Sequence, residues 1–175
     1  RAAVGSGIIV LPGMEVQTRE EVHLVCLFDT VEQDMAWQEQ VYAHLPPLPN
    51  RPETFGAQFV VDAEGEFVRE NERLLLTSVS WPVDKVVAEV RALNGLCFPA
   101  HVDRPSYSLI ANLGFIPDGL EFEALELSYA LSPDQARQRF PQLAGHTLVV
   151  DGDAHRLSEM QRKTMVKVRE LNVAE

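Results

Sequence analysis

The stretch PGMEVQTREEVHLVCLFD, residues 12–29, places charged side chains at the ends of two apolar runs. The run IIVLPGM leads into Glu15, and the run LVCLF begins directly after His23. Both runs have the length and composition of buried strands, so we predict strands over residues 7–17 and 22–28. An acid and an imidazole at strand ends are typical of a site built at one edge of a sheet.

Outward from this stretch, further buried strands alternate with amphipathic helices. Predicted helices cover residues 31–45, 80–95 and a segment from about Leu157, and predicted strands cover residues 95–101, 120–128 and 146–155. The second helix is expected to be capped by Ser80 with Pro82 in its first turn, and residues 132–135, SPDQ, match a capping box. This alternation predicts an α/β fold with a mostly parallel sheet.

Residues 46–78 interrupt the alternation. The segment PPLPNRPETFG, residues 46–56, is rich in proline, and FVVDAEGEFV, residues 59–68, has the pattern of a β-hairpin. A chain of 175 residues suits one domain with a sizeable core. We therefore predict a single domain over residues 1–175 with an insertion at about 46–78.

The composition restricts the partners that we expect. The net charge is −11 and no cluster of Lys and Arg is visible, so we predict that the protein does not bind duplex nucleic acid. A phosphorylated substrate is compatible with this charge, because bound metal ions can supply local positive charge. No signal peptide and no apolar run long enough to span a bilayer is visible, so we expect a cytoplasmic protein without a membrane partner. Cys26 and Cys97 lie in apolar runs and are expected to be buried thiols.

Five polar residues stand at the ends of buried runs. They are Glu15, His23, His101, Asp153 and His155. Their oxygen and nitrogen atoms form a ligand set that suits Zn, Mn or Fe. Each residue taken alone is more often a solvated or structural side chain, but five together favour a metal site. The other histidines, His44 and His146, lack this placement and are expected at the surface.

Four motifs, in this order, resemble the PHP family, the polymerase and histidinol phosphatase domain. They are PGMEVQT (12–18), EVHLVCLFD (21–29), GLCFPAHVDRP (95–105) and GDAHR (152–156), and the resemblance covers essentially the whole chain. It implies a distorted β/α barrel with two or three divalent metal ions at the carboxyl ends of the strands. It also implies phosphoester hydrolysis by metal-activated hydroxide, with ligands at Glu15, His23, His101, Asp153 and His155.

The chain departs from the family pattern at its beginning. The family's Asp-x-His-x-His strand and its Thr-Asp-His strand are both missing from this sequence. We therefore expect a C-terminal portion of the domain, with an incomplete barrel and an incomplete metal site. An open barrel edge would expose unpaired backbone, so we expect a homodimer or association with the missing segment.

The resemblance gives three residues catalytic roles. Glu15 would bridge two metal ions, Asp153 would bridge or ligate, and Arg104 would contact phosphate. For Arg104 a surface ion pair with Asp103 or another acid is an equally weighted alternative. The loops suggest pocket-lining residues, namely Asn71, Arg73, Arg104 and Tyr107.

Three functions follow from the sequence. The first is a metal-dependent phosphoesterase acting on a small phosphomonoester, a nucleotide or a short oligonucleotide. The second is a PHP-like interaction or regulatory module that has lost its catalytic site. The third is an unrelated α/β protein whose polar residues at strand ends are structural.

Overall fold

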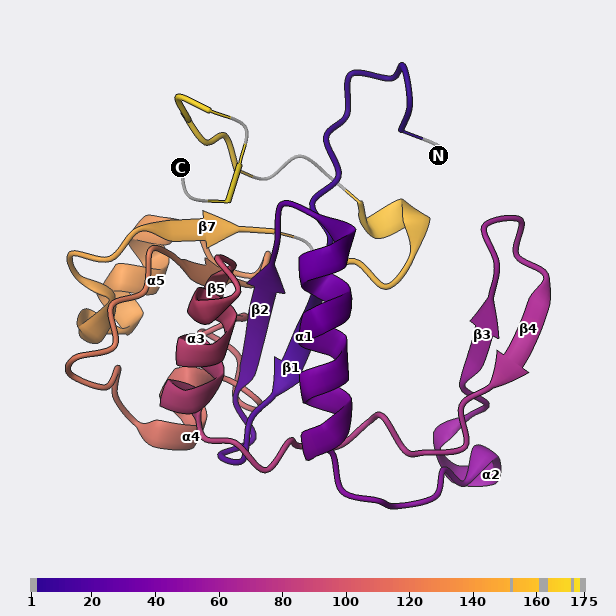
Figure 1. Ribbon diagram of the computed structural model, residues 1–175. Coiled ribbons are helices and arrows are strands. Elements are labelled where there is room, and N and C mark those ends of the chain that lie inside the picture. The colour runs from indigo at the N-terminus through magenta and orange to yellow at the C-terminus, as the bar shows by residue number, and fades with distance from the viewer. Residues whose placement is uncertain (1–2, 152, 161–163, 171, 174–175) are drawn as a thin grey trace.

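The computed structural model describes residues 3–151, 153–160, 164–170 and 172–173. The fold is mixed α/β, with helices packed on small sheets and a hairpin that stands apart from the body of the molecule (Figure 1). The strands are β1 Gly13–Gln17, β2 His23–Leu27, β3 Phe59–Val61, β4 Phe67–Glu70, β5 Leu96–Pro99, β6 Leu125–Leu127 and β7 Leu148–Val150. The helices are α1 Val31–His44, α2 Pro52–Phe55, α3 Val83–Ala92, α4 Leu109–Leu113 and α5 Pro133–Arg139, with 3-10 turns at Pro141–Leu143 and Leu157–Glu159.

The sheets confirm the α/β class but correct the predicted strand direction. The central sheet has the order β1-β2-β5, and both of its pairings are antiparallel, whereas β6 and β7 form a parallel pair. Only residues 18–22 connect β1 to β2. A connection this short permits antiparallel pairing alone, because parallel neighbours need a crossover of about a dozen residues or more. The described residues do not form a closed barrel.

Four predicted elements are much shorter than the sequence suggested. One is the strand predicted over residues 120–128, which is reduced to β6. The strand predicted over residues 7–17 begins only at Gly13, and the preceding Ile8, Ile9 and Val10 are exposed. The strand predicted over residues 146–155 is reduced to β7. The helix predicted from Leu157 is a single 3-10 turn within the described residues, and residues 161–163 of that prediction lie outside them.

The core lies between the central sheet and the helices α1 and α3. Alternate residues of β2 and the residue after it, Leu24, Cys26 and Phe28, are fully buried. The predicted apolar face of α3 is confirmed, because its four valines are buried, but the helix begins at Val83 with Pro82 rather than Ser80 as its N-cap. The capping box at residues 132–135 is confirmed at the start of α5.

The apolar stripe that helical spacing predicts for helix α1, Val31, Met35, Val41, Tyr42 and Leu45, is confirmed only in part. Leu45, directly after α1, is buried and Val41 packs against the core. Val31, Met35 and Tyr42 are exposed, whereas Trp37 is completely buried. The Trp37 ring stacks on Trp81 with the ring centroids 6.1 Å apart. The indole therefore anchors α1 through aromatic packing, which a periodicity based on aliphatic residues does not reveal.

The two cysteines lie opposite each other on β2 and β5. The Sγ atoms of Cys26 and Cys97 are 3.9 Å apart, and both thiols are free and buried, as predicted. Burial raises the pKa of the Cys26 thiol well above its ordinary value, and the neighbouring Cys97 raises it further. The pair is therefore an inert part of the core.

The insertion contains the predicted hairpin, formed by β3 and β4. Its Phe59 and Phe67 rings meet edge to face and stay exposed. Arg73, beyond the hairpin, donates hydrogen bonds of 2.7, 2.8 and 3.2 Å to the carbonyls of Tyr42, Leu45 and Pro46. Arg73 therefore ties the insertion to the end of α1. Among the described residues, no helix is both long and apolar enough to cross a membrane.

Candidate metal centre

Strand pairing brings an acid and two imidazoles together. In the register of β1 and β2, Gln17 faces His23 and Glu15 faces Val25, which puts Glu15 and His23 on one face of the sheet. His101 follows β5, the other neighbour of β2, so it reaches the same place. One ligand atom from each of Glu15, His23 and His101 lies within 4.8 Å of the other two. These three residues are called the Glu-His-His cluster below.

A single oxygen of Glu15 contacts both rings. Its Oε1 lies 2.7 Å from Nδ1 of His23 and 3.3 Å from Nε2 of His101. Burial alone would raise the pKa of Glu15, but the hydrogen bonds to His101 and His23 and their charge outweigh it and lower the pKa to about 2. Glu15 is therefore ionised at neutral pH and oriented toward the two imidazoles.

The chemistry of the cluster fits a divalent cation. Two imidazole nitrogens and one carboxylate form a donor set that Zn, Mn and Fe accept. His101 is 3% exposed, and its Nδ1 is buried without a hydrogen-bond partner among the described residues. Its Nε2, which faces Glu15, is thus the ring nitrogen available within the cluster. The metal-ligand role of the three residues remains a proposal.

The imidazole of His23 is fixed on several sides. Its Nε2 lies 3.2 Å from Oε1 of Gln17, and its backbone N–H donates to the carbonyl of Tyr107 at 2.9 Å. The Tyr107 ring stacks on His23 with centroids 4.9 Å apart. His101 and Tyr107 both have positive φ angles, of 31° and 56°. Such strained backbone at residues other than glycine is concentrated at functional sites.

Asp153 and His155 are not members of the Glu-His-His cluster among the described residues. Asp153 forms an ion pair with Arg104 at 2.6 Å, and His155 lies 3.6 Å from Asp153 with a side chain that is 78% exposed. Arg104 thus adopts the ion pair that was its alternative role, although Asp103 is not its partner. Asp153 has a φ angle of 40° and lies beyond the end of β7, so it does not continue the extended strand that was predicted over residues 146–155. The ligand roles of Asp153 and His155 stay predictions.

The two remaining histidines were expected at the surface, but both are half-buried. His44 is half-buried, and its ring lies 3.8 Å from the Trp81 ring, measured between centroids. It is a packing residue at the end of α1 rather than a surface residue. His146 lies outside the cluster, and its carbonyl accepts a hydrogen bond from Arg137.

Glu126 on β6 is a candidate that the sequence analysis missed. It is 2% exposed, and its Oε1 is buried without a hydrogen-bond partner among the described residues. Burial raises the pKa of Glu126 to about 9, assisted by the carboxylates of Asp151 and Glu15 and opposed by the backbone N–H of His101. A protonated carboxyl therefore lies next to the Glu-His-His cluster. The sequence feature that could have identified Glu126 is its position between two leucines in the short strand LEL.

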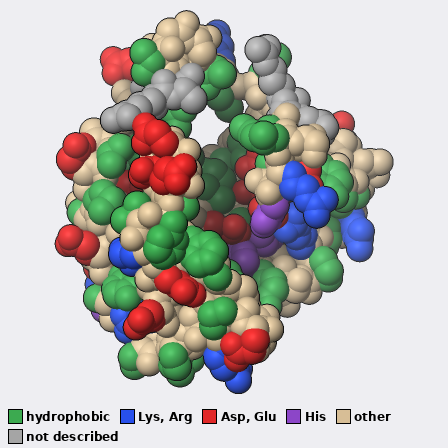
Figure 2. All heavy atoms as spheres, turned by 90° about the vertical axis from the view of Figure 1, so that its right-hand side faces the viewer, with side chains coloured by type: hydrophobic (Ala, Val, Ile, Leu, Met, Phe, Trp, Pro, Cys, Tyr) green, Lys and Arg blue, Asp and Glu red, His purple; other side chains and the backbone are tan. Residues whose placement is uncertain are grey.

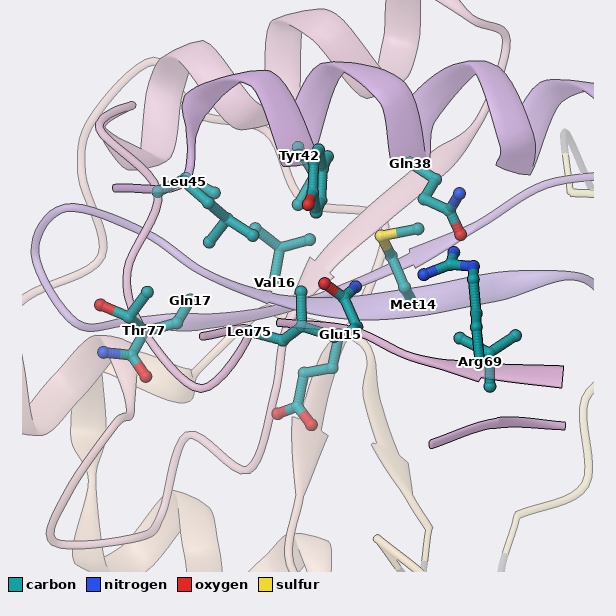
Figure 3. A pocket seen from close by; sticks show the side chains of 14 residues that line it. Met14, Glu15, Val16, Gln17, Gln38, Tyr42, Leu45, Arg69, Leu75 and Thr77 are labelled. Atoms are coloured by element: carbon teal, nitrogen blue, oxygen red, sulfur yellow. The ribbon is translucent and has the colours of Figure 1, made fainter. Parts of the chain in front are cut away.

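A cavity of about 600 Å³ lies at the free edge of β1, between α1 and the insertion. Figure 3 shows that Met14 and Val16 point toward α1, whereas the carboxylate of Glu15 points away from it. Asn71 lines this cavity, as predicted, together with Gln38 from α1. On the face of the molecule shown in Figure 2, acidic and histidine side chains gather beside a central hollow.

Comparison with known proteins supports the fold. The chain matches no family model and no curated protein. It is similar to the crystal structure of the lesion-specific endonuclease PfuEndoQ from Pyrococcus furiosus, with 19% sequence identity and a TM-score of 0.52. It is also similar to endonuclease Q in complex with a 27-mer duplex that has an abasic lesion at the active site, with 17% identity and a TM-score of 0.48.

The likeness covers 82% of this chain in both cases, but only 30% and 31% of the endonuclease chains. The chain therefore spans about a third of the length of the solved proteins that it matches. The likeness supports a PHP-like fold, whereas a closed barrel is not shown.

The comparison also corrects one prediction. The expected partner was a small phosphorylated substrate, and duplex nucleic acid was excluded, yet a structurally similar protein was crystallised with a duplex substrate. That part of the sequence analysis is wrong. The prediction relied on a net charge of −11, which is the sum over the whole chain and does not describe the local charge of one surface.

Proposed function

We propose that this chain carries part of a metal-dependent phosphodiesterase that cleaves nucleic acid. The observation that carries the proposal is the convergence of Glu15, His23 and His101 within 4.8 Å. The likeness to a lesion-specific endonuclease supports nucleic acid as the substrate class. A divalent ion held there would activate water and stabilise the charge that develops on the phosphoryl group.

The chain's own residues would bind the metal ion and orient the side chains that hold it. Glu15, ionised at neutral pH, holds both imidazoles through one oxygen, while Gln17 and the Tyr107 ring keep the His23 ring in place. Preorganised groups of this kind need no rearrangement when charge develops in the transition state. Asp153 and His155 would complete a site for two or three ions, with Arg104 as a phosphate contact, once the segment after β7 approaches the cluster.

Hydrolysis of an end-labelled oligonucleotide, single-stranded and duplex, tests this function. Protein stripped with EDTA should be inactive and should recover activity with Mn, Zn or Fe(II). Glu15→Gln should lower the rate by roughly a hundredfold or more, because it removes the negative charge that holds the cluster. The matched variant His146→Gln, in a histidine outside the cluster, should keep the wild-type rate.

Two results would argue against an enzyme. If Glu15→Gln cleaved as fast as the wild type, the Glu-His-His cluster would not be the reactive centre. If the wild type bound metal and oligonucleotide but cleaved neither strand with any of the three metals, the non-catalytic module would be the better description.

A further inference from the structure

A second groove lies beside the proposed site, on the side of Arg104. It has a volume of about 530 Å³ and is lined by residues from two loops and from α5. One loop, Asp103 to Pro105, directly follows the cluster residue His101, and the other, Ser128 to Leu131, follows β6. The groove therefore begins two residues after the cluster residue His101, and all of its lining residues lie outside the Glu-His-His cluster.

The two loops are joined by a specific contact. The carboxylate of Asp103 accepts hydrogen bonds of 2.7 Å from both the backbone N–H and the hydroxyl of Ser128. The backbone N–H of Arg104 also donates to the carbonyl of His101 at 2.9 Å. These bonds stabilise the Asp103 carboxylate and fix the walls of the groove, so the groove is preformed.

Two guanidinium groups line this groove. Arg104 is partly neutralised by Asp153, but no described acid lies within ion-pair distance of Arg139. The Arg139 side chain is exposed at the end of α5, where it lies over the Phe140 ring. In a chain with a net charge of −11, an unpaired arginine facing a groove is a local site for an anion.

An aromatic ring accompanies these cations. Tyr129 is 70% exposed and lines the same groove. Single-stranded nucleic acid is bound by cations that follow the backbone and by exposed aromatic rings on which bases stack. The combination of Arg139 and Tyr129 supplies one group of each kind.

We propose that this groove binds the nucleic acid strand next to the cleaved phosphodiester, with Arg139 on a backbone phosphate and Tyr129 stacked on a base. The inference rests on the proposed function, because it assumes that the substrate is a nucleic acid strand. The groove would hold the strand in register, and the Glu-His-His cluster would act on the neighbouring phosphate. Arg139 and Tyr129 are thus binding residues that take no part in the chemical step.

Fluorescence anisotropy with a labelled single-stranded oligonucleotide, measured in EDTA at several salt concentrations, tests the groove. Arg139→Gln should weaken binding about fivefold and reduce the slope of log Kd against log salt by about 0.7, the value for one phosphate contact on a single strand. Arg139→Lys should restore most of the salt dependence. Tyr129→Ala should weaken binding about fivefold with the salt slope unchanged.

The matched control is Arg137→Gln, on the same helix but outside the groove, where Arg137 lies 3.9 Å from Asp134. It should bind like the wild type. Hydrolysis of the small phosphodiester bis(4-nitrophenyl) phosphate with Mn reads the metal centre alone and should be equal in wild type, Arg139→Gln and Tyr129→Ala.

The outcomes separate the two proposals. If Arg139→Gln and Arg137→Gln changed binding equally, or if the wild type bound no oligonucleotide, the groove inference would be overturned whatever the hydrolysis result. If binding depended on Arg139 while no phosphodiester was cleaved, the groove would be supported and the proposed phosphodiesterase would fail.

Discussion

At the scale of single residues, the site depends on one carboxylate oxygen shared by two rings. Oε1 of Glu15 contacts His23 and His101, and the resulting pKa of about 2 keeps Glu15 charged over the whole neutral range. Glu126, a short distance away on β6, is the opposite case, with a pKa of about 9. At neutral pH, Glu15 is therefore ionised whereas Glu126 is protonated. The two residues are of the same type, so the difference between their pKa values comes from their environments.

Glu126 should make stability depend on pH in the metal-free protein. Its pKa rises from 4.5 to about 9 on folding, so between these values the folded protein holds a proton that the unfolded chain has released. Stability must then fall as the pH rises through this range. Glu126→Gln cannot ionise, so its urea-unfolding free energy, measured in EDTA from pH 5 to pH 9, should fall less steeply than that of the wild type.

Glu121→Gln, at an exposed glutamate, serves as the control for Glu126→Gln and should keep the wild-type profile. Parallel pH profiles for the wild type and Glu126→Gln would show that the proton on Glu126 does not stabilise the fold.

At the scale of elements, Arg73 joins the insertion to α1. The last carbonyls of a helix have no partner within the helix, and Arg73 donates to three carbonyls in and after the last turn of α1. Its guanidinium also lies 4.7 Å from the centroid of the Tyr42 ring. One side chain thus closes a helix end and fixes the position of an inserted segment.

Removal of this side chain should be costly. Arg73→Ala should lower the free energy of unfolding by about 2 kcal/mol or more, because hydrogen bonds to a charged group each contribute roughly 1.5–3 kcal/mol. Arg51→Ala, at an exposed arginine whose contact is with Phe55, should change stability by less than about 1 kcal/mol. Equal effects of the two changes in thermal unfolding would contradict the bridging role of Arg73.

The elements also show which parts of the fold a sequence can specify. Helix α3 was predictable because its valines recur at helical spacing and a buried face receives them. Ile8, Ile9 and Val10 have equally apolar sequence but no described element covers them, so they are exposed. The spacing of apolar residues depends on one segment alone. Burial also depends on elements that are distant in the sequence, so it cannot be predicted from that segment.

At the scale of the whole molecule, the candidate site joins two strands that are consecutive in the sequence, β1 and β2, to the residue His101, which follows the distant strand β5. Glu15, His23 and His101 were predictable because polar residues at the ends of apolar runs are conspicuous. The separate position of Asp153 was not, because it depends on a left-handed φ angle and an ion pair with Arg104. Glu126 was missed because a buried acid in the middle of a strand is visible only once its neighbours are known.

Metal binding should stabilise the whole fold, because the ligands come from separate strands and converge only in the folded state. A divalent ion at a hundredfold excess over its Kd should add about 2.7 kcal/mol to the free energy of unfolding. The rise in melting temperature on addition of Zn or Mn should disappear in EDTA and be largely absent in His101→Ala. His146→Ala should keep the full rise, and an equal rise in both variants would place the metal elsewhere.

The aromatic stack between α1 and the loop before α3 has an optical consequence. The chain contains only two tryptophans, and Trp37 and Trp81 lie against each other with His44 over the second ring. The tryptophan emission of the protein, excited selectively over its three tyrosines, therefore originates from a single place. Tryptophan fluorescence recorded during denaturation therefore reports the detachment of α1 and does not report the unfolding of β6, β7 or the hairpin. Unfolding should be treated as one cooperative event only if circular dichroism gives the same transition.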